Sequence, residues 1–153
     1  MTLGIGIMAA ALGVTVLADL VTKSLILSRR FAGAAALPAL GIMDAADPAG
    51  SGRRILQPRL NVRAPICRAP RALLIGVWML SLFAVSFLLL DSRTPGMSEV
   101  GWGWALGGSA ANLIDRLRRG GILDFVAIGP WPPFNLADAA IVAGLSAVGV
   151  SAL

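Results

Sequence analysis

The stretch ALLIGVWMLSLFAVSFLLL, residues 72–90, contains 19 residues and no charge. A helix that crosses the hydrocarbon core of a bilayer needs about 20 predominantly apolar residues. The whole chain agrees with this, since 57% of its residues are hydrophobic and only 14% are charged, whereas about a quarter are charged in soluble domains. The sequence therefore predicts one integral membrane domain over residues 1–153.

The segments on either side of this stretch predict three further spans. Residues 91–96, DSRTPG, favour a tight turn, so the next helix is expected to run back antiparallel to the first. That next helix is dense in glycine and alanine, which let helices approach closely in a membrane bundle. The predicted fold class is an all-α membrane protein, a four-helix transmembrane bundle. Its four spans are expected at about 3–27, 72–90, 98–117 and 134–153.

Residues 29–71 form the long loop of this arrangement. They contain eight arginines and five of the nine prolines, and proline interrupts a helix because it lacks a backbone N–H. The loop is therefore not expected to be one continuous helix. Short strands are expected within about 55–66 and over 122–126.

The residue types that are missing restrict the chemistry. The chain has no histidine and a single cysteine, Cys67. This composition excludes Ser-His-Asp and Cys-His nucleophilic sites and the usual Cys/His zinc sites. No metal or cofactor is predicted, and any catalysis is expected to depend on carboxylates, lysine, hydroxyl groups or the backbone.

Three aspartates lie inside or at the edge of the apolar segments, namely Asp19, Asp115 and Asp138. A charged side chain at the centre of a bilayer costs about 2.5 to 3.5 kcal/mol, so such residues are functional candidates. Antiparallel packing of the last two spans would bring Asp115 and Asp138 to the same membrane face. Two neighbouring carboxylates share a proton, as in aspartic proteases. Asp115 and Asp138 are therefore predicted to be a catalytic pair.

Each of these two acids follows an asparagine by three residues, Asn112 before Asp115 and Asn135 before Asp138. Residues at this spacing share one face of a helix, so the amides can support the carboxylates. Two structural alternatives stay open. Asn135 with Asp138 also fits a helix N-cap, and Asp115, which precedes several arginines, also fits a solvated helix end.

The other buried acids have simpler interpretations. Asp19 and Lys23 are four residues apart, a spacing that favours an ion pair on one helix. Asp124, in the expected strand at 122–126, is predicted to hold Arg116 or Arg118.

Four segments together resemble the lipoprotein signal peptidases, also called signal peptidase II, a family of membrane aspartic proteases. The last three follow one another in the order and spacing of the family. The four segments are DLVTK at 19–23, GGSAANLIDR at 107–116, GILDF at 121–125 and FNLAD at 134–138.

The resemblance assigns a role to each matched position. It implies that the catalytic residues are Asp115 and Asp138. The supporting residues that it implies are Asn112, Arg116, Asn135 and Ala137, and the structural ones are Asp19, Lys23 and Asp124.

The resemblance also implies an activity and a location. The family has four transmembrane helices with a small extracytoplasmic β element, lies in the bacterial cytoplasmic membrane, and uses no cofactor. It cleaves prolipoproteins just before a diacylglyceryl-modified cysteine. The expected partners are prolipoproteins with a lipidated cysteine and membrane lipids, without nucleic acid, and the expected state is a monomer.

Some positions depart from the pattern of the family. Leu20 replaces a glutamine, Ala111 replaces a glycine, and the nearest match to the first-loop segment Asn-x-Gly-x-Ala-Phe is NVRA at 61–64. This leaves an alternative, a catalytically silent membrane relative with a binding or structural role.

The basic residues bear on the orientation in the membrane. In the predicted topology all of them except Arg93 flank the face that carries Asp115 and Asp138. Basic residues are enriched on the cytoplasmic side of membrane proteins, whereas the resemblance puts this face outside. We expect the orientation of the family.

Overall fold

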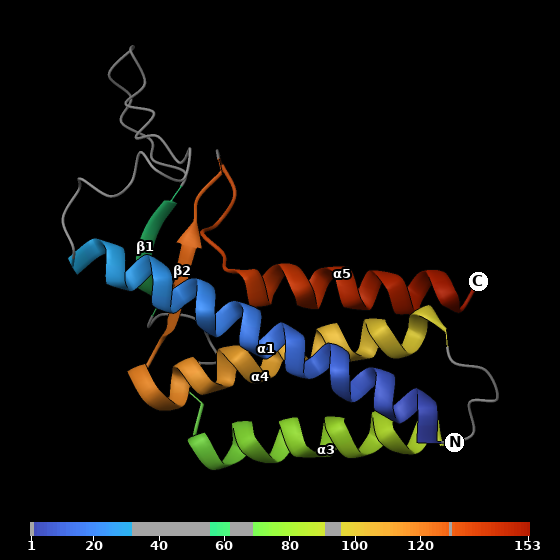
Figure 1. Ribbon diagram of the computed structural model, residues 1–153. Coiled ribbons are helices and arrows are strands. Elements are labelled where there is room, and N and C mark those ends of the chain that lie inside the picture. Colours follow the sequence, from blue (N-terminus) through green and yellow to red (C-terminus); the bar gives the residue numbers. More distant parts are fainter. Residues whose placement is uncertain (1, 32–55, 62–68, 91–95, 129) are drawn as a thin grey trace.

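The computed structural model describes residues 2–31, 56–61, 69–90, 96–128 and 130–153. Within these residues the chain forms four helices and a two-stranded sheet (Figure 1). The fold class predicted from the sequence, a four-helix bundle with a small β element, is confirmed. The elements are α1 Thr2–Phe31, β1 Leu56–Asn61, α3 Arg71–Leu89, α4 Met97–Arg119, β2 Ile122–Val126 and α5 Leu136–Ser151.

The four helices lie where hydropathy placed the spans, with ends that differ by a few residues. Leu3–Ser28 in α1 and Arg71–Leu89 in α3 are long and apolar enough to cross a membrane, and Leu136–Ser151 is a shorter apolar helix. Helix α4 has 23 residues, but it is less apolar because polar and charged residues occupy its C-terminal half. The depth of each helix in a bilayer stays a prediction.

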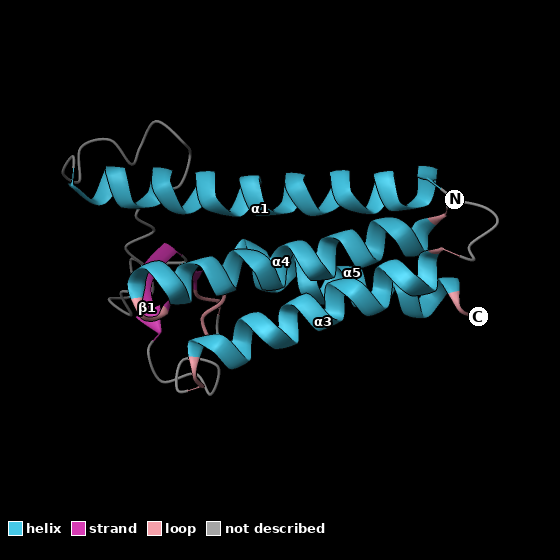
Figure 2. Cartoon of the chain, turned by 90° about the horizontal axis from the view of Figure 1, so that it is seen from below, coloured by secondary structure: helices cyan, strands magenta, loops and turns pink. Residues whose placement is uncertain are grey.

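Helix α4 packs against α5, α1 and α3 and so forms the centre of the bundle (Figure 2). Its glycines permit this close packing. A Cβ atom at Gly103 would lie 2.6 Å from the Met8 carbonyl oxygen of α1, and one at Gly108 would lie 2.4 Å from the Ala137 carbonyl oxygen of α5. The expectation that the small residues of this segment form a helix-packing surface is confirmed.

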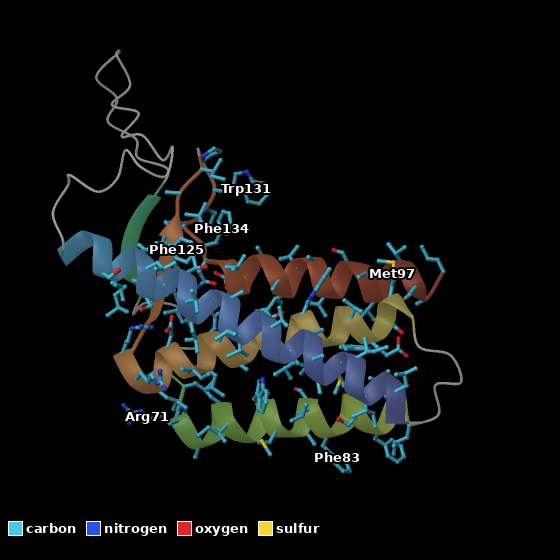
Figure 3. All side chains as sticks on the ribbon, in the orientation of Figure 1. Arg71, Phe83, Met97, Phe125, Trp131 and Phe134 are labelled. Atoms are coloured by element: carbon cyan, nitrogen blue, oxygen red, sulfur yellow. The ribbon has the colours of Figure 1, made fainter. Side chains whose placement is uncertain are left out.

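The distribution of side chains is the reverse of that in a soluble protein. The largest fully buried side chains are polar or charged, whereas α3 exposes large apolar side chains, among them Leu80 at 67% and Phe83 at 69%. Figure 3 shows Phe83 pointing away from the other helices. An apolar exterior around buried charges is the arrangement expected where lipid is the solvent. The fully buried set is Lys23, Glu99, Asn135, Asp19 and Asp115.

The sheet lies at one end of the bundle. Strand β1 runs antiparallel to β2, with Arg59 opposite Asp124 and Asn61 opposite Ile122. Helix α1 and helix α4 end near the sheet and α5 begins there, while α1 begins and α5 ends at the opposite end (Figure 1). The two short strands expected from the sequence are present; residue 55 and residues 62–66 of the first expected segment lie outside the described residues.

Candidate active site

The polar residues singled out in the sequence converge at the sheet end of the bundle. Gly120 makes this possible, because its positive φ of 75° ends α4 and turns the chain directly into β2, a backbone conformation that glycine adopts without steric cost. Strand β2 then returns to α5 through a bridge between Val126 and Phe134. The backbone N–H groups of Phe125 and Val126 both donate to the Phe134 carbonyl oxygen, at 3.1 and 2.9 Å.

Asn135 and Asp138 cap the first turn of α5 reciprocally. The Asp138 N–H donates to Asn135 Oδ1 at 2.9 Å, and the Asn135 N–H donates to Asp138 Oδ2 at 3.1 Å. This is a capping box, which satisfies two backbone donors at the start of a helix. The structural alternative for Asn135, a helix N-cap, is therefore confirmed.

The capping role does not use all of the polar atoms of these two residues. Asp138 Oδ1 accepts a 2.8 Å hydrogen bond from Asn112 Nδ2 of α4. Asn135 Nδ2 donates to Asn112 Oδ1 and to Asp124 Oδ1, both at 3.1 Å. One fully buried amide thus joins the helix cap, α4 and β2. Asn112 and Asn135 together connect the carboxylates of Asp124 and Asp138.

Asp124 is buried, and its hydrogen-bond partners are neutral amides. It is 4% exposed, and besides Asn135 it accepts a 3.1 Å hydrogen bond from Asn61 Nδ2 of β1. Burial raises the pKa of Asp124, and the nearby charge of Asp138 raises it further, against the opposing effects of the two amides and of Lys23. Asp124 was expected to hold Arg116 or Arg118, but its hydrogen-bond partners are asparagine amides.

Asp115 has charged partners instead. Its Oδ2 lies 2.8 Å from Lys23 Nζ and accepts the Leu123 N–H at 3.2 Å, while its Oδ1 contacts the Arg119 guanidinium. The carboxylate is fully buried, so the alternative of a solvated helix end is wrong. The negative charge of Asp115 is compensated by two cations.

The expected ion pair on α1 is present. Lys23 Nζ lies 2.6 Å from Asp19 Oδ2, and both side chains are fully buried. Lys23 therefore lies between Asp19 of its own helix and Asp115 of α4. Asp19 Oδ1 also accepts the Ala137 N–H at 3.0 Å, which ties α1 to the start of α5.

Within the described residues, no hydrogen bond or ion pair joins Asp115 to Asp138. The hydrogen bonds and ion pairs of Asp115 go to Lys23, Arg119 and the backbone of Leu123. Asp138 is bound instead by the asparagines that also contact Asp124. The carboxylate that acts electrostatically on Asp124 is Asp138. The pairing of Asp115 with Asp138 stays a prediction.

The remaining predicted residues lie around this centre. Asn112 and Ala137 are buried, and Arg116 is partly buried, with an Nε that has no hydrogen-bond partner in the described part of the chain. Asn61 was not predicted as a site residue, although it is the first residue of the nearest first-loop match. Its role depends on the pairing of β1 with β2, which the sequence did not reveal. Residues 62–64 of that match lie outside the described residues.

Comparisons with known proteins add independent information. A family model described as signal peptidase (SPase) II matches residues 11–153. Lipoprotein signal peptidases from Halothermothrix orenii and Xylella fastidiosa are each 39% identical, over 69 and 92 residues. These matches cover 43% and 51% of this chain and 48% and 55% of the relatives. The matched part therefore spans about half the length of these relatives.

Solved structures share the fold. Two bacterial membrane enzymes, determined by the in meso method at 2.3 and 1.9 Å resolution, superpose with TM-scores of 0.69 and 0.67. Each is 18% identical, and the superpositions cover 96% and 97% of this chain and 87% and 93% of the solved chains. The fold is thus that of a membrane enzyme, and nearly the whole sequence fits one family model. The chain belongs to the signal peptidase II family.

Proposed function

We propose that this protein is an aspartic endopeptidase that cleaves the signal peptides of prolipoproteins just before the diacylglyceryl-modified cysteine. Two observations support the substrate class: the family model matches residues 11–153, and the relatives carry the name lipoprotein signal peptidase. The observation that carries the catalytic type is the convergence of two carboxylates on Asn135, whose side-chain amide donates to Asp124 and whose backbone N–H donates to Asp138.

The geometry favours Asp124 and Asp138 as the catalytic pair, in place of Asp115 and Asp138. Asp138 is partly exposed, whereas Asp124 is buried among amides and has a raised pKa. Two acids with different environments are the usual basis for separate acid and base roles. Asp115 suits a supporting role better, because two cations and a backbone N–H already occupy its oxygens.

The roles follow from exposure and protonation. Asp138, which water can reach, takes a proton from the water molecule as that water attacks the scissile carbonyl carbon. Asp124, which retains its proton more readily, donates a hydrogen bond to the carbonyl oxygen as negative charge develops on it. When the tetrahedral intermediate collapses, the carbon–nitrogen bond breaks and the leaving amine takes up a proton from the pair.

Asn112 and Asn135 fix the positions of both carboxylates. Each amide donates to one of the acids, and a 3.1 Å hydrogen bond joins the two amides. A catalytic group must be held within hydrogen-bond reach of its target atom. These two asparagines therefore orient the acids through neutral hydrogen bonds.

The location of the site fits the proposed substrate. The pair lies at one end of the bundle, at the start of α5, and hence near a membrane surface if the helices cross the bilayer. A cysteine anchored by a diacylglyceryl group holds its neighbouring peptide bond at the same depth. We infer a multi-pass protein of the bacterial cytoplasmic membrane, monomeric, with its site near the extracytoplasmic face and with prolipoproteins and membrane lipids as partners.

Cleavage of a synthetic lipopeptide by the purified protein in lipid nanodiscs tests the proposal. Asp124→Asn and Asp138→Asn should each lower kcat by at least about 100-fold, the smaller end of the usual contribution of a general acid or base. Glu99→Gln, a fully buried carboxylate at the opposite end of the bundle, is the matched control and should retain activity.

The same assay separates the two possible pairs. Loss of cleavage in Asp115→Asn together with full cleavage in Asp124→Asn would restore the pair Asp115–Asp138. Cleavage that survives in Asp138→Asn would contradict both pairs and the aspartic mechanism.

A further inference from the structure

The buried charges beneath the two acids form one connected cluster. Lys23 Nζ lies 2.6 Å from Asp19 Oδ2 and 2.8 Å from Asp115 Oδ2, and all three side chains are fully buried. The lysine is on α1 and Asp115 is on α4, so the ammonium group joins the two helices at this end of the bundle. Buried charges are costly unless they are paired, so this cluster is expected to have a single arrangement.

Each carboxylate of the cluster also holds a backbone amide, and the positions of these amides are informative. Asp115 accepts the N–H of Leu123, the residue immediately before Asp124. Asp19 accepts the N–H of Ala137, the residue immediately before Asp138. The two acids of the proposed pair are thus each preceded by a residue whose backbone is fixed to a carboxylate of the cluster.

We infer that Lys23 is a positioning residue for Asp124 and Asp138. Its ammonium group pairs with the carboxylates of Asp19 and Asp115, and each of these carboxylates accepts the N–H of the residue that precedes one of the two acids. This inference rests on the proposed function, since it assigns the way in which the catalytic pair keeps its spacing. Lys23 touches neither acid by hydrogen bond or ion pair; it acts through Asp19 and Asp115. The ammonium group controls the distance between β2 and α5, and a displacement of about 1 Å can cost about 100-fold in rate.

Lys23 also acts on Asp124 through its charge. Among the side chains that the structure describes, the charged groups that act on Asp124 are Lys23 of α1 and Asp138 of α5, while Asn61 of β1 and Asn135 are neutral donors. The positive charge of Lys23 lowers the pKa of Asp124, and Asp138 raises it. Loss of the lysine should therefore raise the pKa of Asp124 and shift the loss of its proton to higher pH.

The first test is Lys23→Met, which keeps the side-chain length and removes the charge. We expect kcat to fall about 100-fold with KM nearly unchanged, because the lysine is too deeply buried to bind substrate. The alkaline limb of the kcat profile should move to higher pH. Glu99→Gln removes an equally buried charge at the other end of the bundle and should change neither quantity. An unchanged kcat and pH profile in Lys23→Met would overturn the inference.

A second pair of variants covers the case in which Lys23→Met does not fold. Asp19→Asn keeps an oxygen that can accept the Ala137 N–H, and Asp19→Ala removes it. If the cluster positions the backbone, kcat should be about tenfold higher for Asp19→Asn than for Asp19→Ala, because the alanine variant leaves the buried Ala137 N–H without a partner. Equal activity of the two variants would contradict a role for this hydrogen bond.

A measurement without catalysis separates this inference from the proposed function. In protein labelled with isotopic alanine and leucine, the amide signals of Ala137 and Leu123 should both shift in the lysine variant or in Asp19→Ala, although Lys23 bonds to neither amide. If the wild-type protein cleaves no lipopeptide, the proposed function fails while the amide signals still report the linkage. If the wild type is active and neither signal moves, the inference fails alone.

Discussion

At the scale of single residues, Asn135 combines a structural and a chemical task. Its carboxamide oxygen caps α5, while its amide nitrogen donates to Asn112 and Asp124. Capping alone requires only the oxygen, and aspartate caps helices as well as asparagine does. The amide nitrogen is therefore the part of the side chain that distinguishes a site residue from an ordinary cap.

Two substitutions at this position separate the two tasks. Asn135→Asp keeps the cap but puts an oxygen opposite Asn112 Oδ1 and Asp124 Oδ1, so kcat should fall by at least about 100-fold. Asn135→Ala loses the cap, worth about 1 kcal/mol of stability, and both donated hydrogen bonds. Lipopeptide cleavage and thermal unfolding would be measured for both. An aspartate variant with full activity would reduce Asn135 to a helix cap.

The raised pKa of Asp124 predicts a pH dependence of stability. Because the native state binds this proton more tightly than the unfolded chain, with its ordinary value of 3.8, the native state carries more protons between the two pKa values. The unfolding free energy contributed by Asp124 therefore falls as pH rises through that interval. Thermal unfolding in nanodiscs across this pH range should show the decline, and Asp124→Asn should remove it. A steeper decline in the variant would contradict the assignment.

The sequence predicts only some of the contacts that the acids of the site make. Spacing along one helix revealed the ion pair of Asp19 with Lys23, because residues four apart share a face. The same reasoning said nothing about the other neighbour of Lys23, since Asp115 reaches it from α4. Asp124 was undervalued for a similar reason: its neutral partners Asn61 and Asn135 come from elements distant in the sequence.

At the scale of elements, hydropathy located all four helices, whereas the sheet required tertiary information. Strand β1 carries arginine and proline in its sequence, LQPRLN, and such a strand has a weak intrinsic signal. It forms by pairing with β2, and this pairing brings Asn61 to Asp124. Helix positions are thus set by local apolar runs, and the site depends on contacts between runs.

The glycines of α4 give a prediction at this scale. Gly108→Val would put a Cβ 2.4 Å from the Ala137 carbonyl oxygen, so α5 must move away or the helices must separate. The variant should unfold at a lower temperature and should lose activity, because Asp138 moves with α5. Gly13→Val, on α1 with nothing within 4 Å of its Cβ, is the matched control. Equal unfolding temperatures for the two variants would contradict the close α4–α5 contact.

At the scale of the whole molecule, charge and apolar surface are divided between inside and outside. The buried charges Asp19, Lys23 and Asp115 gather at the sheet end, and α3 presents apolar side chains such as Phe83 to its surroundings. A buried ion cluster is tolerable in a bilayer only when its members satisfy one another. The polar interior therefore has to be built from several helices at once. For this reason no single segment of the sequence predicts the buried ion cluster.

The orientation in the membrane is the last prediction, and two arguments oppose each other. In the topology predicted from the sequence, all basic residues except Arg93 flank the end that carries the sheet, and the positive-inside tendency assigns that end to the cytoplasm. The proposed substrate requires that end outside, because the lipid-modified cysteine is presented there. Charge bias acts through loops of up to about 60 residues, and the loop 29–71 falls within that range, so the charge argument keeps its weight. The match of the family model to residues 11–153 is the reason to expect the orientation of the family.

We therefore expect the chain ends inside and the site outside. A reporter fused after Leu153 should show cytoplasmic activity, and one fused after Arg71, at the opposite end of α3 from Leu89, should show the reverse signal. The two fusions control each other, since an unfolded or uninserted chain gives the same signal at both points. An external reporter at Leu153 with an internal one at Arg71 would put the acids on the cytoplasmic side. A prolipoprotein presents its lipid-anchored cysteine at the opposite leaflet, so the proposed cleavage would then be geometrically impossible.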